Sequence, residues 1–219
     1  MATGTADQTA VPTEQRLVAA AEKLFAQKGI DAVSLRAIMA EADTNVASVH
    51  YHFGSKDALV KAVIAHRGRE IARQRGRLLD ALETAPDPTA RRLAEAVVRP
   101  IADADAAWVR FISGIIATGH PAMKTVARGF AHQGRRSTAL LARICPAVPP
   151  ATIRFRLAQA MTLAFHVLGD LDNAQGILAL SGAPSTPDQI VEQLLDVITA
   201  ILAGPPEQGH LHAGSGDRL

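Results

Sequence analysis

The sequence predicts an all-α protein, and three observations support this prediction. Alanine, leucine and arginine dominate the composition, and glycine and proline fall between segments of roughly 10 to 25 residues with helical apolar spacing. β-Branched and aromatic residues are not grouped in the alternating runs that strands require. A chain of 219 residues is also long enough to bury a substantial helical core.

The first helix is predicted over residues 13–28, where Gly29 provides a left-handed cap. Its buried face has the i, i+3, i+4, i+7 spacing and consists of Leu17, Ala20, Ala21, Leu24 and Phe25. Ser34 is the predicted N-cap of a short second helix that ends near Ala42. Its inner face would hold Leu35, Ile38 and Met39.

A tight turn at residues 43–44 leads to a third short helix, for which Asn45 is a good N-cap. Two short helices joined in this way indicate a helix-turn-helix, whose second helix can enter a DNA major groove. The small side chains of Ala47 and Ser48 would let the backbone approach DNA closely, while Val49 faces the core. The sequence therefore predicts double-stranded DNA as a partner.

The end of this third helix carries further candidates for phosphate contact. Tyr51 and His52 can hydrogen-bond phosphates, and Phe53 would anchor the helix inward. Lys56 lies in the first turn of a fourth helix capped by Ser55, where the helix dipole disfavours a cation. A phosphate bound jointly by Lys56 and the helix amides would explain the lysine.

The run SLRAIMAEADTNVASVHYHFGSKDALV closely resembles the DNA-binding signature of TetR-type transcriptional regulators, and the resemblance covers about residues 13–65. It implies an N-terminal three-helix helix-turn-helix domain joined by helix four to a helical ligand-binding and dimerisation domain. Asp43 and Thr44 stand where the family usually has glycine and valine, and His50 stands where tyrosine or asparagine is more common. Aspartate tolerates the left-handed conformation, so the turn should survive.

The resemblance also assigns roles to individual residues. Base contacts are implied for Arg36, Ser48 and His50. Phosphate contacts are implied for Ser34, Asn45, Tyr51, His52 and Lys56. Without the family pattern, Tyr51 and Phe53 would be interpreted as core residues and the two neighbouring histidines as a metal pair. Metal is not expected, because positions two apart on a helix point about 200° apart and no cysteine or carboxylate completes a site; no cofactor is predicted either.

The charge distribution is unusual for a DNA-binding segment. Residues 1–60 contain seven acidic and five basic residues. A basic cluster follows directly and consists of Lys61, Arg67, Arg69, Arg73, Arg75 and Arg77. Such a run is more often a solvated helix face, although it can add long-range attraction. Weak non-specific DNA affinity with a modest salt dependence is therefore expected.

Residues 58–203 are predicted to form the helical ligand-binding and dimerisation domain, after a DNA-binding domain at 13–57. Further helices are expected over residues 56–82, 90–102, 105–119, 121–144, 151–172 and 187–203. Pro121 would open one of them at its first position. Residues 145–150, CPAVPP, should be a rigid loop, and a polar, glycine-containing loop should follow residue 172. Thr186 and Gln189 form a capping box for the last helix.

The last helix is apolar over more than one stripe, through Ile190, Val191, Leu194, Leu195, Val197, Ile198, Ile201 and Leu202. Paired with the apolar helix at 151–172, it suits a four-helix interface of a homodimer. Burial entirely within one subunit is the alternative. A dimer would present two recognition helices about 34 Å apart to the half-sites of a pseudo-palindrome.

A small-molecule pocket is predicted between the middle helices. Its candidate lining residues are large and apolar or amphipathic: Trp108, Phe111, Ile115, Met123, Phe130, Met161, Phe165 and His166. The same side chains would equally fill an ordinary core. His166 and Asp170 have i, i+4 spacing, which could orient a polar ligand or bind metal, although a structural hydrogen bond is the simpler interpretation. Gly114 and Gly169 could leave room beside them, and the scarcity of charge suggests a mainly hydrophobic ligand.

The predicted function is a ligand-responsive transcriptional regulator, most simply a repressor, with an activator or an operator-free binding or scaffold protein as alternatives. An α-helical enzyme is not expected, because no nucleophile elbow, phosphate-binding glycine loop or HExxH pair occurs. The single Cys145, the lack of a signal peptide and the lack of a long apolar run predict a cytoplasmic protein without membrane contact. Residues 1–12 and 204–219 are predicted to be a flexible arm and a disordered tail.

Overall fold

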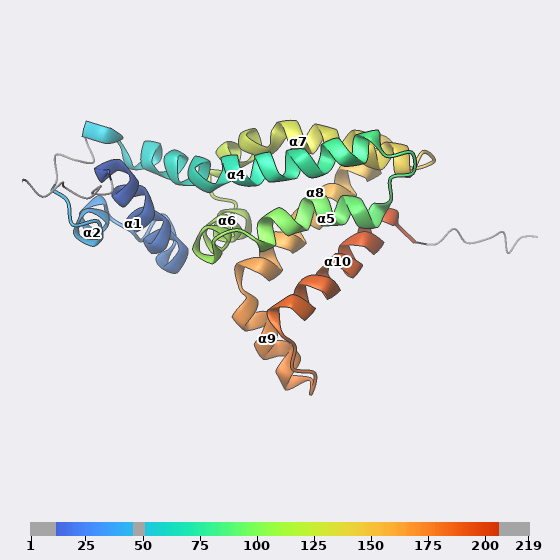
Figure 1. Ribbon diagram of the computed structural model, residues 1–219. Helices are drawn as coiled ribbons and strands as arrows, with labels where there is room; N and C mark the ends of the chain where they lie inside the picture. The colour runs from blue at the N-terminus through green and yellow to red at the C-terminus, as the bar shows by residue number, and fades with distance from the viewer. Residues whose placement is uncertain (1–11, 46–50, 206–219) are drawn as a thin grey trace, which may run out of the picture.

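The computed structural model describes residues 12–45 and 51–205, and every regular element in these ranges is helical. The helices are α1 (Thr13–Lys28), α2 (Leu35–Glu41), α4 (Lys56–Thr84), α5 (Ala90–Ala102), α6 (Ala106–Thr118), α7 (Met123–Ile144), α8 (Pro150–Gly169), α9 (Leu171–Leu180) and α10 (Pro187–Ala203). The predicted all-α fold class is confirmed. In Figure 1, α1 and α2 lie at one end of an elongated molecule, and α4 runs from this end along the whole bundle.

The N-terminal head consists of α1, α2 and the first turns of α4. Leu17, Ile38 and Leu59 come from these three helices and are fully buried. Lys23 of α1 forms an ion pair of 2.6 Å with Glu41 of α2 at the surface. The head therefore has a small core of its own, which holds α2 at a set angle to the start of α4.

Helix α4 connects this head to the rest of the molecule. Its 29 residues are continuous, so it is about 43 Å long at 1.5 Å per residue. Arg143 of α7 donates hydrogen bonds to the carbonyl oxygens of Leu82, Glu83 and Ala85 at its C-terminal end. These bonds satisfy carbonyl groups that a helix end leaves without partners. They also explain why α4 reaches Thr84, slightly beyond the expected end near Leu82.

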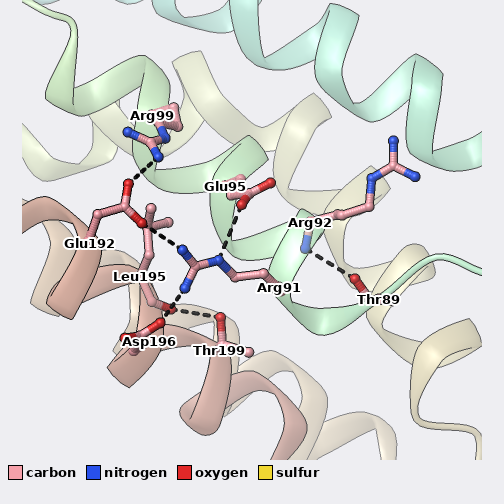
Figure 2. A network of polar contacts seen from close by, with 9 residues as sticks. All are labelled: Thr89, Arg91, Arg92, Glu95, Arg99, Glu192, Leu195, Asp196 and Thr199. Atoms are coloured by element: carbon pink, nitrogen blue, oxygen red, sulfur yellow. Dashed lines mark hydrogen bonds and ion pairs between the residues drawn. The ribbon is translucent and has the colours of Figure 1, made fainter.

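Helix α10 is held against α5 by charged residues as well as by its apolar face. Figure 2 shows Arg91 of α5 between Glu95 of its own helix and both Glu192 and Asp196 of α10. Arg99 reaches Glu192 from one side, with 2.5 Å between Nη2 and Oε1. Surface ion pairs contribute little individually, but a shared network orients the two helices relative to each other.

Two predicted helix boundaries were wrong. Pro121 does not open α7, because residues 121–122 form a turn and the helix starts at Met123. The His120 Nδ1 atom accepts a hydrogen bond from the Ala122 amide, which stabilises this turn. The helix expected to reach residue 172 ends at Gly169, where Asp170 adopts φ −147° and ψ 64°.

The prediction of a loop after residue 172 is also wrong, because residues 171–180 form helix α9. The Asp170 carboxylate accepts a hydrogen bond from the Asn173 amide and acts as the N-cap of α9. None of the ten residues of α9 is buried, and Figure 1 shows this helix projecting from the bundle beside α10. None of the helices in the described ranges is both long and apolar enough to cross a membrane.

Candidate DNA-binding and effector sites

The candidate DNA-contact residues at the start of α2 and α4 are exposed or half-buried at the surface of the head. Ser34 and Ser55 are N-caps, and their Oγ atoms accept hydrogen bonds from the Ala37 and Ala58 amides. Arg36 is exposed in the first turn of α2, and Lys56 is half-buried at the first position of α4. A cap hydroxyl that accepts from the backbone still has its own hydrogen to donate. Both helix starts can therefore offer donors to an anion.

Tyr51 and His52 lie between these two helix starts and are helical. Tyr51 is 85% exposed although it is the single tyrosine of the chain. Its ring meets His52 edge to face with 5.1 Å between centroids, and Phe53 packs against the core as predicted. The exposed phenol can both donate and accept a hydrogen bond, so Tyr51 is placed to contact another molecule at this surface.

Of the remaining residues of the predicted DNA site, the structure describes only Asn45. Asn45 is exposed. Ala47, Ser48 and His50, together with Val46 and Val49, lie outside the described residues.

The turn that precedes this segment has the backbone expected from the sequence. Asp43 has φ +48°, in the left-handed region, and the Thr44 amide donates to the Met39 carbonyl at 3.0 Å. The tight turn after α2 thus forms with aspartate in a position that favours glycine.

The head meets the bundle through apolar contacts and the buried carboxyl group of Glu22. Phe25 of α1 stacks on Phe111 of α6 with 5.7 Å between ring centroids. Nearby, Glu22 is only 5% exposed, and its Oε1 atom lies 3.8 Å from Arg67 Nε of α4. Burial, together with the charge of Asp105 and against the opposing charge of Arg67, raises the pKa of Glu22 to about 7. Sequence patterns missed this residue because a glutamate on α1 ordinarily points to solvent.

The eight candidate effector residues are not gathered around one cavity. Trp108 and Phe165 are fully buried against each other, with ring centroids 6.2 Å apart, and the Trp108 indole donates to the Val63 carbonyl. Phe111 and Ile115 border a hollow between the head and α6. Met161 is half-buried against the core, and Met123 is exposed at the start of α7.

The other two candidates, Phe130 and His166, line two separate pockets. Phe130 borders a cavity between α4 and α7. His166 borders an apolar groove of about 340 Å³ between α8, α9 and α10, and Asp170 borders the same groove. Since the helix breaks at Asp170, whose carboxylate caps α9, the proposed helical pairing with His166 does not form. Among the residues that the structure describes, no three histidine, cysteine or acidic side chains are grouped to hold a metal ion.

Most of the apolar surface of α10 is buried within one chain, which was the alternative to its burial in a dimer interface. Six of its eight apolar residues are buried against the same chain: Ile190, Val191, Leu194, Leu195, Ile198 and Leu202. Helix α10 packs on both α5 and α8, which uses two sides of the helix. Val197, 50% exposed, is left at the edge of the groove.

Within the described residues, a small helical head that carries the start of the predicted helix-turn-helix is joined by one long helix to an all-α bundle, the arrangement expected of a helical DNA-binding regulator. The sequence matches two models that describe bacterial regulatory proteins of the tetR family, over residues 17–63, and the tetracyclin repressor-like C-terminal domain, over residues 101–200. The chain belongs to the TetR family, whose members are transcriptional regulators rather than enzymes.

Individual relatives agree with this assignment. An HTH-type transcriptional repressor of Mycobacterium tuberculosis is 38% identical over 99 residues, which are 42% of this chain and 53% of the relative. The chain thus spans about half the length of the curated relatives it matches. A TetR-family regulator from Streptomyces coelicolor superimposes with a TM-score of 0.58 at 22% identity, covering 87% of this chain and 94% of that one. The multidrug binding protein EbrR, complexed with imidazole, gives a TM-score of 0.52 at 25% identity, covering 91% of this chain and 100% of that one.

Proposed function

We propose that the protein is a ligand-responsive repressor that binds a pseudo-palindromic operator as a dimer and is released by a mainly hydrophobic small molecule. The observation that carries this proposal is α4, which begins with Lys56 in the head and runs unbroken through the bundle to Thr84. Any shift of the bundle end of α4 is transmitted to the head, because a continuous helix moves largely as one body.

The operator contacts in this proposal come from the surface of the head. Arg36 would read a base edge, and Ser34, Asn45, Tyr51, His52 and Lys56 would hold phosphates, which fix the register of the protein on DNA. Ala47, Ser48 and His50 would complete the recognition helix. Support comes from the exposure of Arg36, Asn45, Tyr51 and His52 and from the repressor named among the relatives.

The dimer in this proposal forms through α8 and α10. Val197, Ile177 and Leu163 border an apolar groove that opens between α8, α9 and α10, and Ile177 and Val197 are both half or more exposed. Apolar patches of this kind are usually covered by a partner. A two-fold axis beside the groove would place two heads on successive major grooves, about 34 Å apart.

Release in this proposal is a shift between two populations. The effector would bind a form in which α4 is displaced and the heads no longer match the half-site spacing. A coupling free energy of roughly 1 to 3 kcal/mol, which is about 5- to 150-fold in operator affinity, is sufficient. The solved structure of EbrR with imidazole supports a small-molecule effector in a related bundle.

Selection of bound duplexes from a random DNA library tests this function. The expected product is a pseudo-palindromic consensus. Tyr51→Ala should weaken binding to it by roughly tenfold, and Lys56→Ala should also lower the slope of log affinity against log salt by about 1. Arg92→Gln, on the exposed side of α5, is the matched control and should bind like the parent.

Two results would contradict the proposal. The first is the absence of any consensus from the selection with folded protein. The second is a consensus to which Tyr51→Ala and Lys56→Ala both bind as tightly as Arg92→Gln.

A further inference from the structure

A cavity of about 380 Å³ lies between α4 and α7, within the size range of small-molecule sites. Its apolar wall includes Ile64 and Ala72 of α4 and Phe130 of α7. Gly129 of α7 lies at its exposed rim, where an added Cβ would meet no atom within 4 Å. The cavity adjoins the helix that connects the bundle to the head, as Figure 1 shows for α4 and α7 side by side.

The charged side chains that line this cavity are all of one sign. Arg69 of α4 and Arg128 of α7 line it, and no aspartate or glutamate is found among its described lining residues. Arg128 donates only to neutral oxygens, those of Lys124 and Thr125. Neither arginine forms an ion pair within the described parts of the chain, so both charges are available to an incoming anion.

A third arginine lies behind the apolar wall. Arg75 is 3% exposed, and its guanidinium carbon lies 5.3 Å from the centre of the Phe130 ring. One nitrogen donates to the Val97 carbonyl at 3.0 Å, but Nε has no partner, and no carboxylate of the described residues lies within 4 Å. Burial without such a partner lowers the pKa of Arg75 to about 10.

The same region holds an unused acceptor. The Gln133 amide nitrogen donates to the Ala72 carbonyl, and Ala72 itself lines the cavity. The Gln133 Oε1 atom is buried with no partner. A buried guanidinium without a carboxylate and a buried acceptor without a donor both cost free energy, and such groups call for an explanation.

We propose that this α4–α7 cavity binds a small organic carboxylate. Its acid group would pair with Arg69 and Arg128, and its apolar body would lie on Ile64 and Phe130. The field of buried Arg75 would add to the attraction, since charges interact more strongly away from water. The regulatory consequence rests on the function proposed above: a carboxylate that wedges α4 against α7 would be the class of effector that moves the head.

The test uses ligands that differ in charge at constant shape, with the full-length protein and no DNA. Octanoate, octanamide and octylamine form one series; phenylacetate, phenylacetamide and phenethylamine form the other. Binding is followed by the fluorescence of Trp108, the single tryptophan, and by calorimetry. Trp108 is a suitable reporter because its ring lies next to Gly68, a residue that lines the cavity. A Cβ added at Gly68 would lie 3.8 Å from the Trp108 ring.

The carboxylates should bind roughly tenfold more tightly than the amides, and the amines should bind most weakly. Arg69→Gln and Arg128→Gln should each remove much of this preference. Gly129→Leu should block all binding by filling the space. Arg77→Gln, an exposed arginine on α4 outside the cavity, should behave like the parent and serves as the control for folding and for general charge.

The proposal is overturned if both carboxylates bind no more tightly than their amides, or if the double variant of Arg69 and Arg128 keeps the preference. The duplex selection described above tests the proposed function independently of carboxylate binding. Carboxylate binding that leaves operator affinity unchanged would support the site and contradict its regulatory role. Loss of the operator consensus with carboxylate binding intact would contradict only the proposed function.

Discussion

At the scale of single residues, the most informative side chain is a buried ionisable one, Glu22. Glu22 is enclosed at the junction of α1, α4 and α6, where Arg67 and Asp105 face it. Burial removes the carboxyl group from water, and the attraction of Arg67 at 3.8 Å offsets only part of that cost, so folding favours the protonated form. This makes the junction between head and bundle sensitive to pH near neutrality.

The stability of the folded state should therefore fall as pH rises. The pKa of Glu22 is raised from 4.5 to about 7 in the folded protein, so the folded state binds the proton more tightly than the unfolded state. The stabilisation is complete below pH 4.5 and is lost as pH rises through about 7. A shift of this size, at 1.36 kcal/mol per pKa unit, limits the loss to about 3.5 kcal/mol.

Urea unfolding at several pH values measures this effect. Glu22→Gln should reduce the fall in unfolding free energy between pH 5 and pH 8. Glu14→Gln, which changes an exposed carboxylate on the same helix, should keep it. Equal pH profiles for the parent and Glu22→Gln would show that another group is responsible.

At the scale of elements, the turn after α2 depends on one unusual backbone angle. Asp43 has φ +48°, the single positive value for a non-glycine residue within the described ranges. The left-handed conformation costs an ordinary residue about 1 to 2 kcal/mol, and less for aspartate or asparagine. The turn therefore tolerates Asp43 where glycine would be free of strain.

Substitutions at Asp43 should separate strain from charge. Asp43→Ala should lower the unfolding free energy by about 1 kcal/mol relative to Asp43→Gly. Asp43→Asn should leave stability nearly unchanged but raise operator affinity, since it removes a negative charge beside the recognition helix. Asp87→Ala in an exposed loop without positive φ is the control for stability. Denaturant unfolding that ranks alanine and glycine equally would contradict the strain argument.

At the scale of the whole molecule, the arrangement of α8, α9 and α10 decides what a second subunit can cover. Most of the apolar surface of α10 is used inside one chain, and its ion pairs with α5 in Figure 2 hold it there. Three exposed apolar side chains lie on the projecting α9 and along the groove beside it: Ile177, Leu180 and Val197. A dimer would therefore be stabilised by the groove more than by the width of α10.

Val197→Arg should dissociate the proposed dimer, because a charge would be buried in an apolar contact without a partner. Analytical ultracentrifugation over a range of concentrations should show monomer for this variant and dimer for the parent. Leu78→Glu, at a partly exposed apolar residue of α4 outside the groove, should remain dimeric. An unchanged association constant for Val197→Arg would place the interface elsewhere.

Much of the fold could be predicted from local signals. The N-cap serines at 34 and 55, the capping box at Thr186 and Gln189, and the glycine caps at 29 and 119 all lie where the pattern predicted helix ends. Helices α5 and α10 have the predicted bounds. Caps are short-range interactions between residues two to four positions apart, so the sequence contains all their parts.

The sequence by itself determined the helical class, most helix ends and the family to which the chain belongs, because these depend on periodicity, capping chemistry and a contiguous motif. Only the tertiary structure decided which apolar residues fill the core and which border a cavity. Trp108 and Phe165 pack on each other, whereas Phe130 faces an open space and covers Arg75. Burial and the pairing of charges depend on segments far apart in the chain, as Glu22, Arg67 and Asp105 illustrate, and no local pattern records which of them will meet.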